Sequence, residues 1–147
     1  MLCRGGLAVD LTKDHKVEDP QETERIKAAG GWVSSRRLCG VLAVSRSFGD
    51  IEYKTLKEKC WERSFSADPL ISEPDVRKEL VNDEDEFVVL ATDGVFDVWS
   101  SQAVVNYVRR RLGDHHDVQM AAKELVAESY KRGTVDNTSA IVVAFGK

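Results

Sequence analysis

The sequence lacks the features that mark secreted, membrane-spanning or low-complexity proteins. Its 147 residues hold only three cysteines and three prolines, and no apolar run approaches the roughly 20 residues of a membrane span. Cys3, Cys39 and Cys60 are odd in number and widely spaced, which excludes a disulfide framework and a zinc-finger spacing. The first residues are too polar and too rich in glycine for a signal peptide. We therefore expect no membrane association and a reducing location, cytoplasmic or nuclear.

The chain also lacks an excess of positive charge. Its net charge is −4 and its sequence pI is about 5.4, which argues against a general nucleic-acid surface and so against a nucleic-acid partner. The remaining composition, 42% hydrophobic and 31% charged, is that of an ordinary globular protein, and the length fits one domain.

The first third of the sequence predicts a hairpin and a short helix. Residues 1–12 read as two strands around a turn at Gly5, and a lone hairpin is too weak to stand without a further strand. Asp19 is a good helix N-cap and Glu22 completes a pattern like a capping box, so we expect a helix over 20–29. That helix is polar enough to lie on the surface.

The middle of the chain predicts strands separated by one long irregular segment. Residues 32–33 and 41–44 read as strands, and residues 51–74 show no period, which indicates a functional or mobile loop. A further strand is expected over 75–80. Residues 87–90 form a continuous Val-rich run, which predicts a central strand buried on both faces.

The last third predicts two helices followed by a strand. Apolar residues recur at helical spacing over 103–112, where Gly113 ends the pattern, and again over 118–129, where Gly133 ends it. Residues 139–145 form a second apolar strand. Because one helix leads away and the other returns, this strand should run antiparallel to the central strand and beside it.

This arrangement brings two distant carboxylates to one edge of the sheet. Asp93 leaves the central strand where Asp136 enters the last one, and neighbouring strands lie about 4.8 Å apart. Two carboxylates that close repel unless a cation lies between them, and oxygen ligands favour Mg²⁺ or Mn²⁺ over zinc. Asp97 lies one helical turn beyond Asp93 and could add a ligand. Asp-Gly at 93–94 and Asp-Asn at 136–137 are also common turn sequences, so spacing alone leaves a plain turn open.

Several segments together resemble the metal-dependent type-2C (PPM) protein serine/threonine phosphatases. They occur in family order along nearly the whole chain, and each is weak alone. The matching stretches are LTKDHK at 11–16, ERI and AGG within 24–31, LAVSRSFGD at 42–50, ATDGVFDV at 91–98 and DNTS at 136–139. The resemblance implies an α+β fold: an antiparallel β-sandwich flanked by helix pairs, of which this chain is the C-terminal portion.

The resemblance also implies roles for particular residues. Asp93 and Asp136 match ligands of a catalytic pair of Mg²⁺ or Mn²⁺ ions, and Asp97 matches a weaker third site. Gly94 and Asn137 would support these loops. Arg46 and Asp50 match a signature near the site and are expected to pair with each other. Residues from about 51 to 74 fall where the family carries a flap, within a partial catalytic domain that spans 1–147.

The implied activity is hydrolysis of phosphoserine and phosphothreonine in proteins by a metal-activated water. The family motif Asp-Gly-His-Gly-Gly is absent from this sequence. The catalytic acid is therefore unknown and expected in an N-terminal half that this chain lacks. We expect the chain alone to be weak or inactive. The alternative is a non-catalytic phosphatase-like module, which forms a homodimer through exposed sheet edges.

Overall fold

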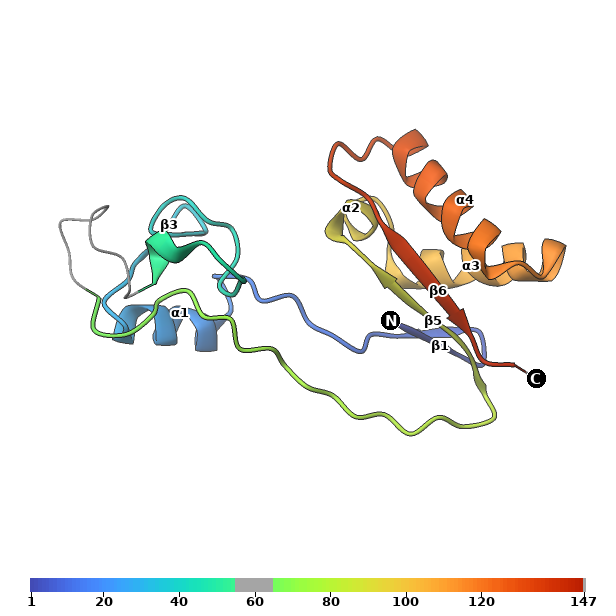
Figure 1. The fold of residues 1–147 in the computed structure, drawn as a ribbon, viewed down its shortest axis with the longest axis horizontal. Helices are drawn as coiled ribbons and strands as arrows, with labels where there is room; N and C mark the ends of the chain where they lie inside the picture. Colours follow the sequence, from blue (N-terminus) through green and yellow to red (C-terminus); the bar gives the residue numbers. More distant parts are fainter. Residues whose placement is uncertain (55–64, 147) are drawn as a thin grey trace. The chain divides into compact units, whose positions relative to one another are not determined.

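The structure is a computed structural model that describes residues 1–54 and 65–146. These residues form two units, drawn as ribbons in Figure 1. Met1–Thr12 and Arg77–Lys147 form the first, which we call the sheet unit, and Lys13–Val76 form the second, the loop unit. Within the described part of the chain, no helix combines the length and apolarity that crossing a membrane requires.

The sheet unit is built on four antiparallel strands in the order β2-β1-β5-β6. The bounds are β1 Leu2–Arg4, β2 Leu7–Val9, β5 Asp85–Ala91 and β6 Ala140–Ala144. The predicted N-terminal hairpin is confirmed, and β1 pairs with β5, which supplies the further strand that the hairpin needs. Gly5 and the glycine after it both have positive φ, as the tight turn between β1 and β2 requires.

Two helices cover one face of this sheet, α3 at Ser101–His115 and α4 at Val118–Lys131 (Figure 1). The predicted helix pair is confirmed, but α3 continues through Gly113 and ends at His115, and His116 caps it in a left-handed conformation. Trp99 contacts both helices, with its ring 5.1 Å from that of Tyr107 and its N–H donating to the hydroxyl of Ser129 at 2.9 Å. The buried cluster of this unit comprises Cys3, Phe87, Val89, Val95, Trp99, Val104, Val105, Val108, Leu125 and Val142.

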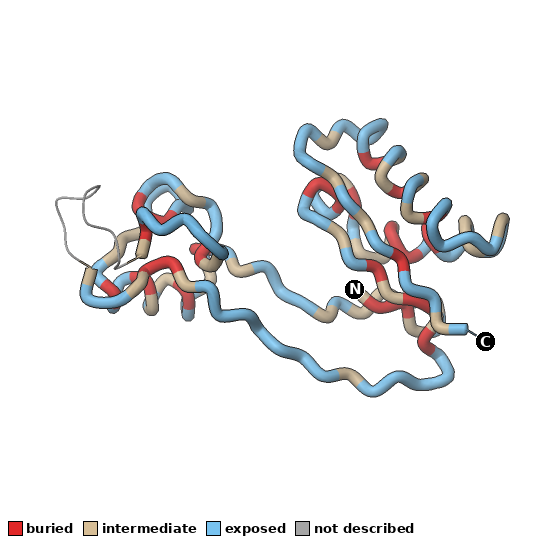
Figure 2. The backbone as a smooth tube through the Cα atoms, viewed as in Figure 1, coloured by how far each residue is buried: buried red, intermediate tan, exposed pale blue. Residues whose placement is uncertain are grey.

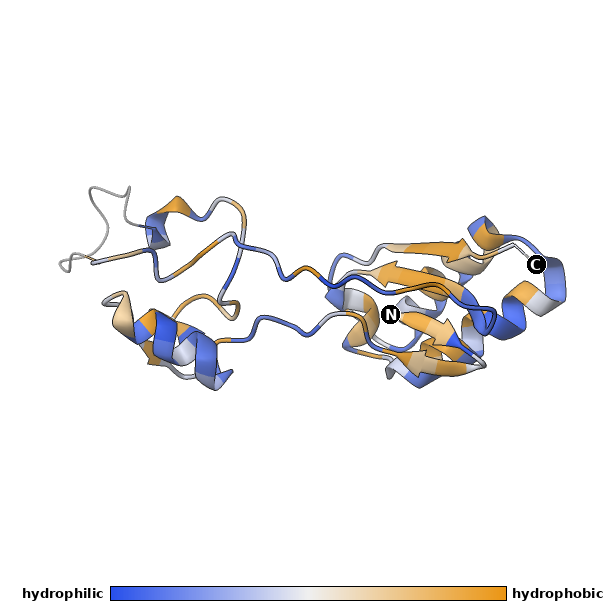
Figure 3. Ribbon diagram, turned by 90° about the horizontal axis from the view of Figure 1, so that it is seen from below, coloured by the Kyte–Doolittle hydropathy of each residue, from blue (hydrophilic) through white to orange (hydrophobic). Residues whose placement is uncertain are grey.

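The other face of the sheet is not covered within the sheet unit. Phe87 and Val89 point into the core, whereas Leu90, Ile141 and Val143 are 53%, 60% and 47% exposed. Buried residues alternate with partly buried ones over most of β5, whereas β6 has one buried residue, Val142, and Figure 2 shows buried stretches interrupting paler ones along these strands. Figure 3 shows that these strands are largely hydrophobic. The prediction of a strand buried on both faces is therefore wrong for the described residues, because helices pack on only one side.

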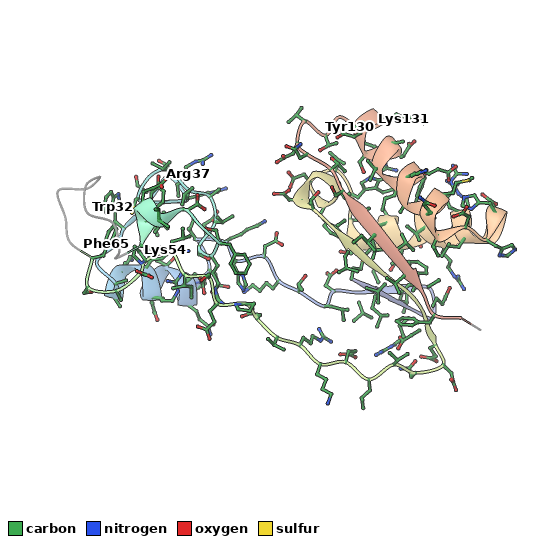
Figure 4. The ribbon with its side chains drawn as sticks, in the orientation of Figure 1. Trp32, Arg37, Lys54, Phe65, Tyr130 and Lys131 are labelled. Atoms are coloured by element: carbon green, nitrogen blue, oxygen red, sulfur yellow. The ribbon has the colours of Figure 1, made fainter. Side chains whose placement is uncertain are left out.

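The part of the loop unit that the structure describes has little regular structure. It contains α1 at Pro20–Ala28, β3 at Val33–Ser34, β4 at Arg37–Leu38 and the 3₁₀-helix η1 at Ile51–Tyr53. Its buried cluster comprises Val17, Ile26, Leu38, Cys39, Tyr53 and Leu70. In Figure 4, Trp32, Arg37, Lys54 and Phe65 mark this unit.

Two predicted strands are wrong. Residues 41–44 form no ladder, and only Leu42 and Val44 make isolated bridges. The partner of β3 is Arg37–Leu38, which the chain reaches by reversing through Ser35 and Arg36, both left-handed. Residues 75–80 make no ladder and are mostly exposed. The helix α1 begins as predicted at Asp19, whose carboxylate accepts the N–H of Gln21 at 3.0 Å. Of the segment 51–74, residues 55–64 lie outside the described residues.

A buried ionic network holds α1 to the rest of the loop unit. Glu22 is only 5% exposed and accepts hydrogen bonds from the guanidinium groups of Arg46, at 2.6 Å and 3.2 Å, and of Arg25, at 2.9 Å. Arg25 also donates to the carbonyl oxygen of Ser45 at 3.0 Å. Glu22 therefore links two arginines instead of completing a capping box, because two cations are stronger donors than one backbone N–H.

Candidate metal centre

The candidate site lies at the edge of the sheet where β5 ends and β6 begins. The ladder between these strands closes with Ala91 opposite Ala140, so the chain leaves β5 beside the point where it enters β6. Figure 1 shows the short helix α2, Asp93–Phe96, at this end of β5. Figure 4 shows Tyr130 and Lys131 at the end of α4, from which the loop with Asp136 leads into β6. The predicted antiparallel neighbours are confirmed.

Gly94 allows the segment 92–94 after β5 to approach the segment 136–139 before β6 closely; we call these two segments the aspartate loops. A Cβ built on this residue would lie 2.6 Å from the hydroxyl oxygen of Thr138 and 2.7 Å from the carbonyl oxygen of Asn137. Real Cβ contacts are essentially never that short, so any side chain here would push the loops apart. The sequence reasoning placed Gly94 as a supporting residue, and the contact gives the physical reason.

The two aspartates are held in similar ways. The N–H of Gly94 donates to Oδ1 of Asp93 at 3.0 Å, and the N–H of Asn137 donates to Oδ1 of Asp136 at 2.6 Å. Each carboxylate is thereby oriented by the next residue in the chain. Both side chains are exposed, as is Asp97, whose N–H donates to the carbonyl oxygen of Asp93 at 2.8 Å.

Among the described residues, no lysine, arginine or histidine forms an ion pair with any of these three aspartates, and the second oxygen of Asp93 and of Asp136 accepts no hydrogen bond. This oxygen chemistry fits a hard divalent cation. No group of three or more metal-binding side chains is assembled within residues 1–54 and 65–146. The arrangement therefore offers part of a cation site.

Arg46 and Asp50 do not pair with each other. Arg46 pairs with Glu22 and with Asp75, whereas the carboxylate of Asp50 accepts the hydroxyl of Ser47 at 2.6 Å. That expectation is wrong, because Arg46 donates instead to the buried carboxylate of Glu22, at 2.6 Å and 3.2 Å, where a charge-assisted hydrogen bond is strong. Both residues belong to the loop unit.

Most of the chain matches one known protein family. The family model described as protein phosphatase 2C matches residues 1–138. The chain belongs to the protein phosphatase 2C family.

Two plant relatives illustrate the match. "Probable protein phosphatase 2C 47" of Oryza sativa subsp. japonica is 39% identical over 145 residues, which is 99% of this chain and 36% of that protein. "Probable protein phosphatase 2C 22" of Arabidopsis thaliana is 41% identical over 143 residues, which is 97% of this chain and 36% of that protein. The chain thus spans little more than a third of the length of these relatives.

Solved structures agree on the fold. A phosphatase from a pathogenic strain of Toxoplasma gondii superposes with a TM-score of 0.82 at 31% identity, over 98% of this chain and 44% of that one. A sex-determining protein of C. elegans superposes with a TM-score of 0.76 at 22% identity, over 97% and 33%. The expected α+β fold of the phosphatase 2C family is confirmed.

Sequence reasoning missed Thr92, which makes several contacts between the two aspartate loops. The signal was present: a polar β-branched residue stands between the end of an apolar strand and an aspartate.

Proposed function

We propose that this chain is part of a metal-dependent protein serine/threonine phosphatase, and that its share of the active site is the pair Asp93 and Asp136. The observation that carries the proposal is the β5–β6 ladder, which brings both aspartate loops to one edge of the sheet. Membership of the protein phosphatase 2C family supports it.

In this proposal Asp93 and Asp136 hold Mg²⁺ or Mn²⁺ through their uncommitted carboxylate oxygens, and Asp97 adds a weaker ligand. When bound, such ions lower the pKa of a coordinated water and stabilise charge on phosphoryl oxygens. The chain's own contribution is orientation. The backbone N–H groups of Gly94 and Asn137 fix the carboxylates, so that little is lost in ordering them when a cation binds.

The substrate we propose is a phosphorylated protein, in the cytoplasm or nucleus. Because the described residues assemble no group of three ligands, the chain alone should bind Mn²⁺ weakly and hydrolyse aryl phosphates slowly. Further ligands and a catalytic acid would have to come from other residues.

The proposal is tested by titrating the chain with Mn²⁺ and following free Mn²⁺ by electron paramagnetic resonance. Asp93→Asn and Asp136→Asn should each raise the Kd at least about tenfold, since each removes an anionic ligand. Asp83→Asn is the matched control, because Asp83 is an exposed aspartate of the same unit with no hydrogen bond to the described residues. Equal Kd values for all four proteins would contradict the proposal.

A second candidate function is self-association without catalysis. The strand order leaves β2 and β6 at the edges of the sheet, and an open edge offers unpaired backbone groups to another strand. In that case light scattering would give the mass of a dimer that Mn²⁺ does not change. A monomer that binds Mn²⁺ would argue for the phosphatase.

A further inference from the structure

Thr92 connects the two aspartate loops through several hydrogen bonds. Its backbone N–H donates to the carbonyl oxygen of Ser139 at 3.1 Å. Its hydroxyl donates to the carbonyl oxygen of Asn137 at 3.1 Å and accepts the N–H of Ser139 at 3.0 Å. One residue directly before Asp93 thus makes three hydrogen bonds to the segment directly after Asp136.

The hydroxyl of Thr92 is not used where a helix would ordinarily use it. Thr92 is the N-cap of α2, a position where threonine usually accepts a backbone N–H of the first helical turn. Its side chain makes no capping hydrogen bond. The hydroxyl is instead turned to the neighbouring loop, 45 residues further along the chain. The hydroxyl of Thr92 therefore bonds to the distant Asp136 loop instead of to its own helix, and so constrains the distance between the two loops.

The contacts of Thr92 and of Gly94 act on the same segment from two sides. Thr92 makes hydrogen bonds with Asn137 and Ser139, the two neighbours of Thr138 in the chain. Gly94, which has no side chain, leaves space for the hydroxyl of Thr138 and the carbonyl of Asn137. The hydroxyl of Thr138 in turn donates to the carbonyl oxygen of Asp136 at 3.0 Å. The Asp136 loop is therefore held both in register and at close range to Asp93.

We infer that Thr92 is a positioning residue, whose hydroxyl sets the separation of the Asp93 and Asp136 carboxylates for cation binding. The inference rests on the proposed function, because the two aspartates must be metal ligands for their separation to matter. Thr92 itself does not bind the cation. It acts through the backbone of Asn137 and Ser139, as residues behind the ligands of metal sites commonly do.

The test compares three substitutions at this position. Thr92→Val keeps the shape and removes the hydroxyl, Thr92→Ala removes it as well, and Thr92→Ser keeps it. Thr12→Val is the matched control, because Thr12 is an exposed threonine of the same unit whose hydroxyl has no partner among the described residues. Urea midpoints are measured for each protein. Thr92 is exposed, so water can solvate the freed groups and the fold should survive.

The first measurement is Mn²⁺ affinity in the 147-residue chain. Thr92→Val and Thr92→Ala should raise the Kd about tenfold, the lower end for residues behind metal ligands, while the serine variant and the control should stay near the parent. The second is amide hydrogen exchange without metal. The Ser139 N–H should exchange faster in the valine and alanine variants only, because only they remove its acceptor.

Each result is decisive. Parent-like Mn²⁺ affinity in the valine and alanine variants would overturn the inference and leave the proposed function standing. An equal loss in the serine variant would overturn it too, because the hydroxyl would not be the cause. No Mn²⁺ binding by the parent would overturn both, and is recognised before any variant is made.

Discussion

The buried carboxylate of Glu22 gives the sharpest stability prediction. Burial raises the pKa of Glu22, but hydrogen bonds from Arg46 and Arg25 outweigh burial and lower the pKa from 4.5 to about 2. By linkage, this lowering stabilises the folded chain by about 3 kcal/mol at neutral pH. Glu22→Gln should therefore lower the free energy of unfolding by about 3 kcal/mol, since it also leaves two guanidinium groups without their shared anion.

The sign of the pH dependence follows from the direction of the change. A carboxyl whose pKa is lowered on folding contributes stability that is complete above its unfolded pKa, 4.5, and that is lost as the pH falls toward about 2. The difference in unfolding free energy between parent and Glu22→Gln should be constant above pH 5.5 or so and shrink between pH 4.5 and 2.

Urea denaturation followed by far-UV circular dichroism measures this difference. Glu24→Gln is the matched control, because Glu24 lies on the same helix, is exposed and makes no ion pair with the described residues. Its effect should stay within about 0.5 kcal/mol. If Glu22→Gln cost no more than this control, or if its cost did not change below pH 4.5, the network would not contribute as reasoned.

Two further predictions concern the sheet unit, and urea denaturation measures both. Gly94→Ala should lower the free energy of unfolding by about 1–3 kcal/mol, because its Cβ would fall 2.6 Å from the hydroxyl of Thr138, and the Mn²⁺ titration should show weaker binding. Gly113→Ala is the control: a Cβ there meets nothing within 4 Å, so the change should stabilise α3 by up to about 1 kcal/mol. Ser129→Ala should cost about 1–3 kcal/mol, because the buried N–H of Trp99 donates to that hydroxyl at 2.9 Å. A loss in the glycine control, or none in the serine variant, would contradict the packing described.

Local signals were enough to predict much of this structure. The N-cap at Asp19, the helical stripes of α3 and α4 and the direction of β6 all depend on neighbours in the sequence, and each was confirmed. The same reasoning placed Asp93 and Asp136 at one edge of the sheet. Their role as metal ligands stays a prediction.

What the sequence could not predict depends on contacts between distant residues. Nothing local shows that Arg46 would pair with Glu22, 24 positions earlier, rather than with Asp50 nearby. The uneven burial of β5 depends on how many faces of the sheet are covered, and a Val-rich sequence does not indicate that number. Thr92 was missed for the same reason, since the partners of its hydroxyl lie 45 and 47 residues away.

The side of the sheet that α3 and α4 leave uncovered also affects how this chain behaves in solution. Leu90, Ile141 and Val143 present aliphatic groups to water, and withdrawing apolar surface from water is favourable by about 25 cal/mol per Å². Dyes whose fluorescence increases on binding to exposed apolar surface should therefore fluoresce in the presence of the native chain. The tendency of the chain to associate with itself should increase as its concentration is raised. Mn²⁺ titrations and light-scattering measurements on this chain are therefore comparable only when they are made at the same protein concentration.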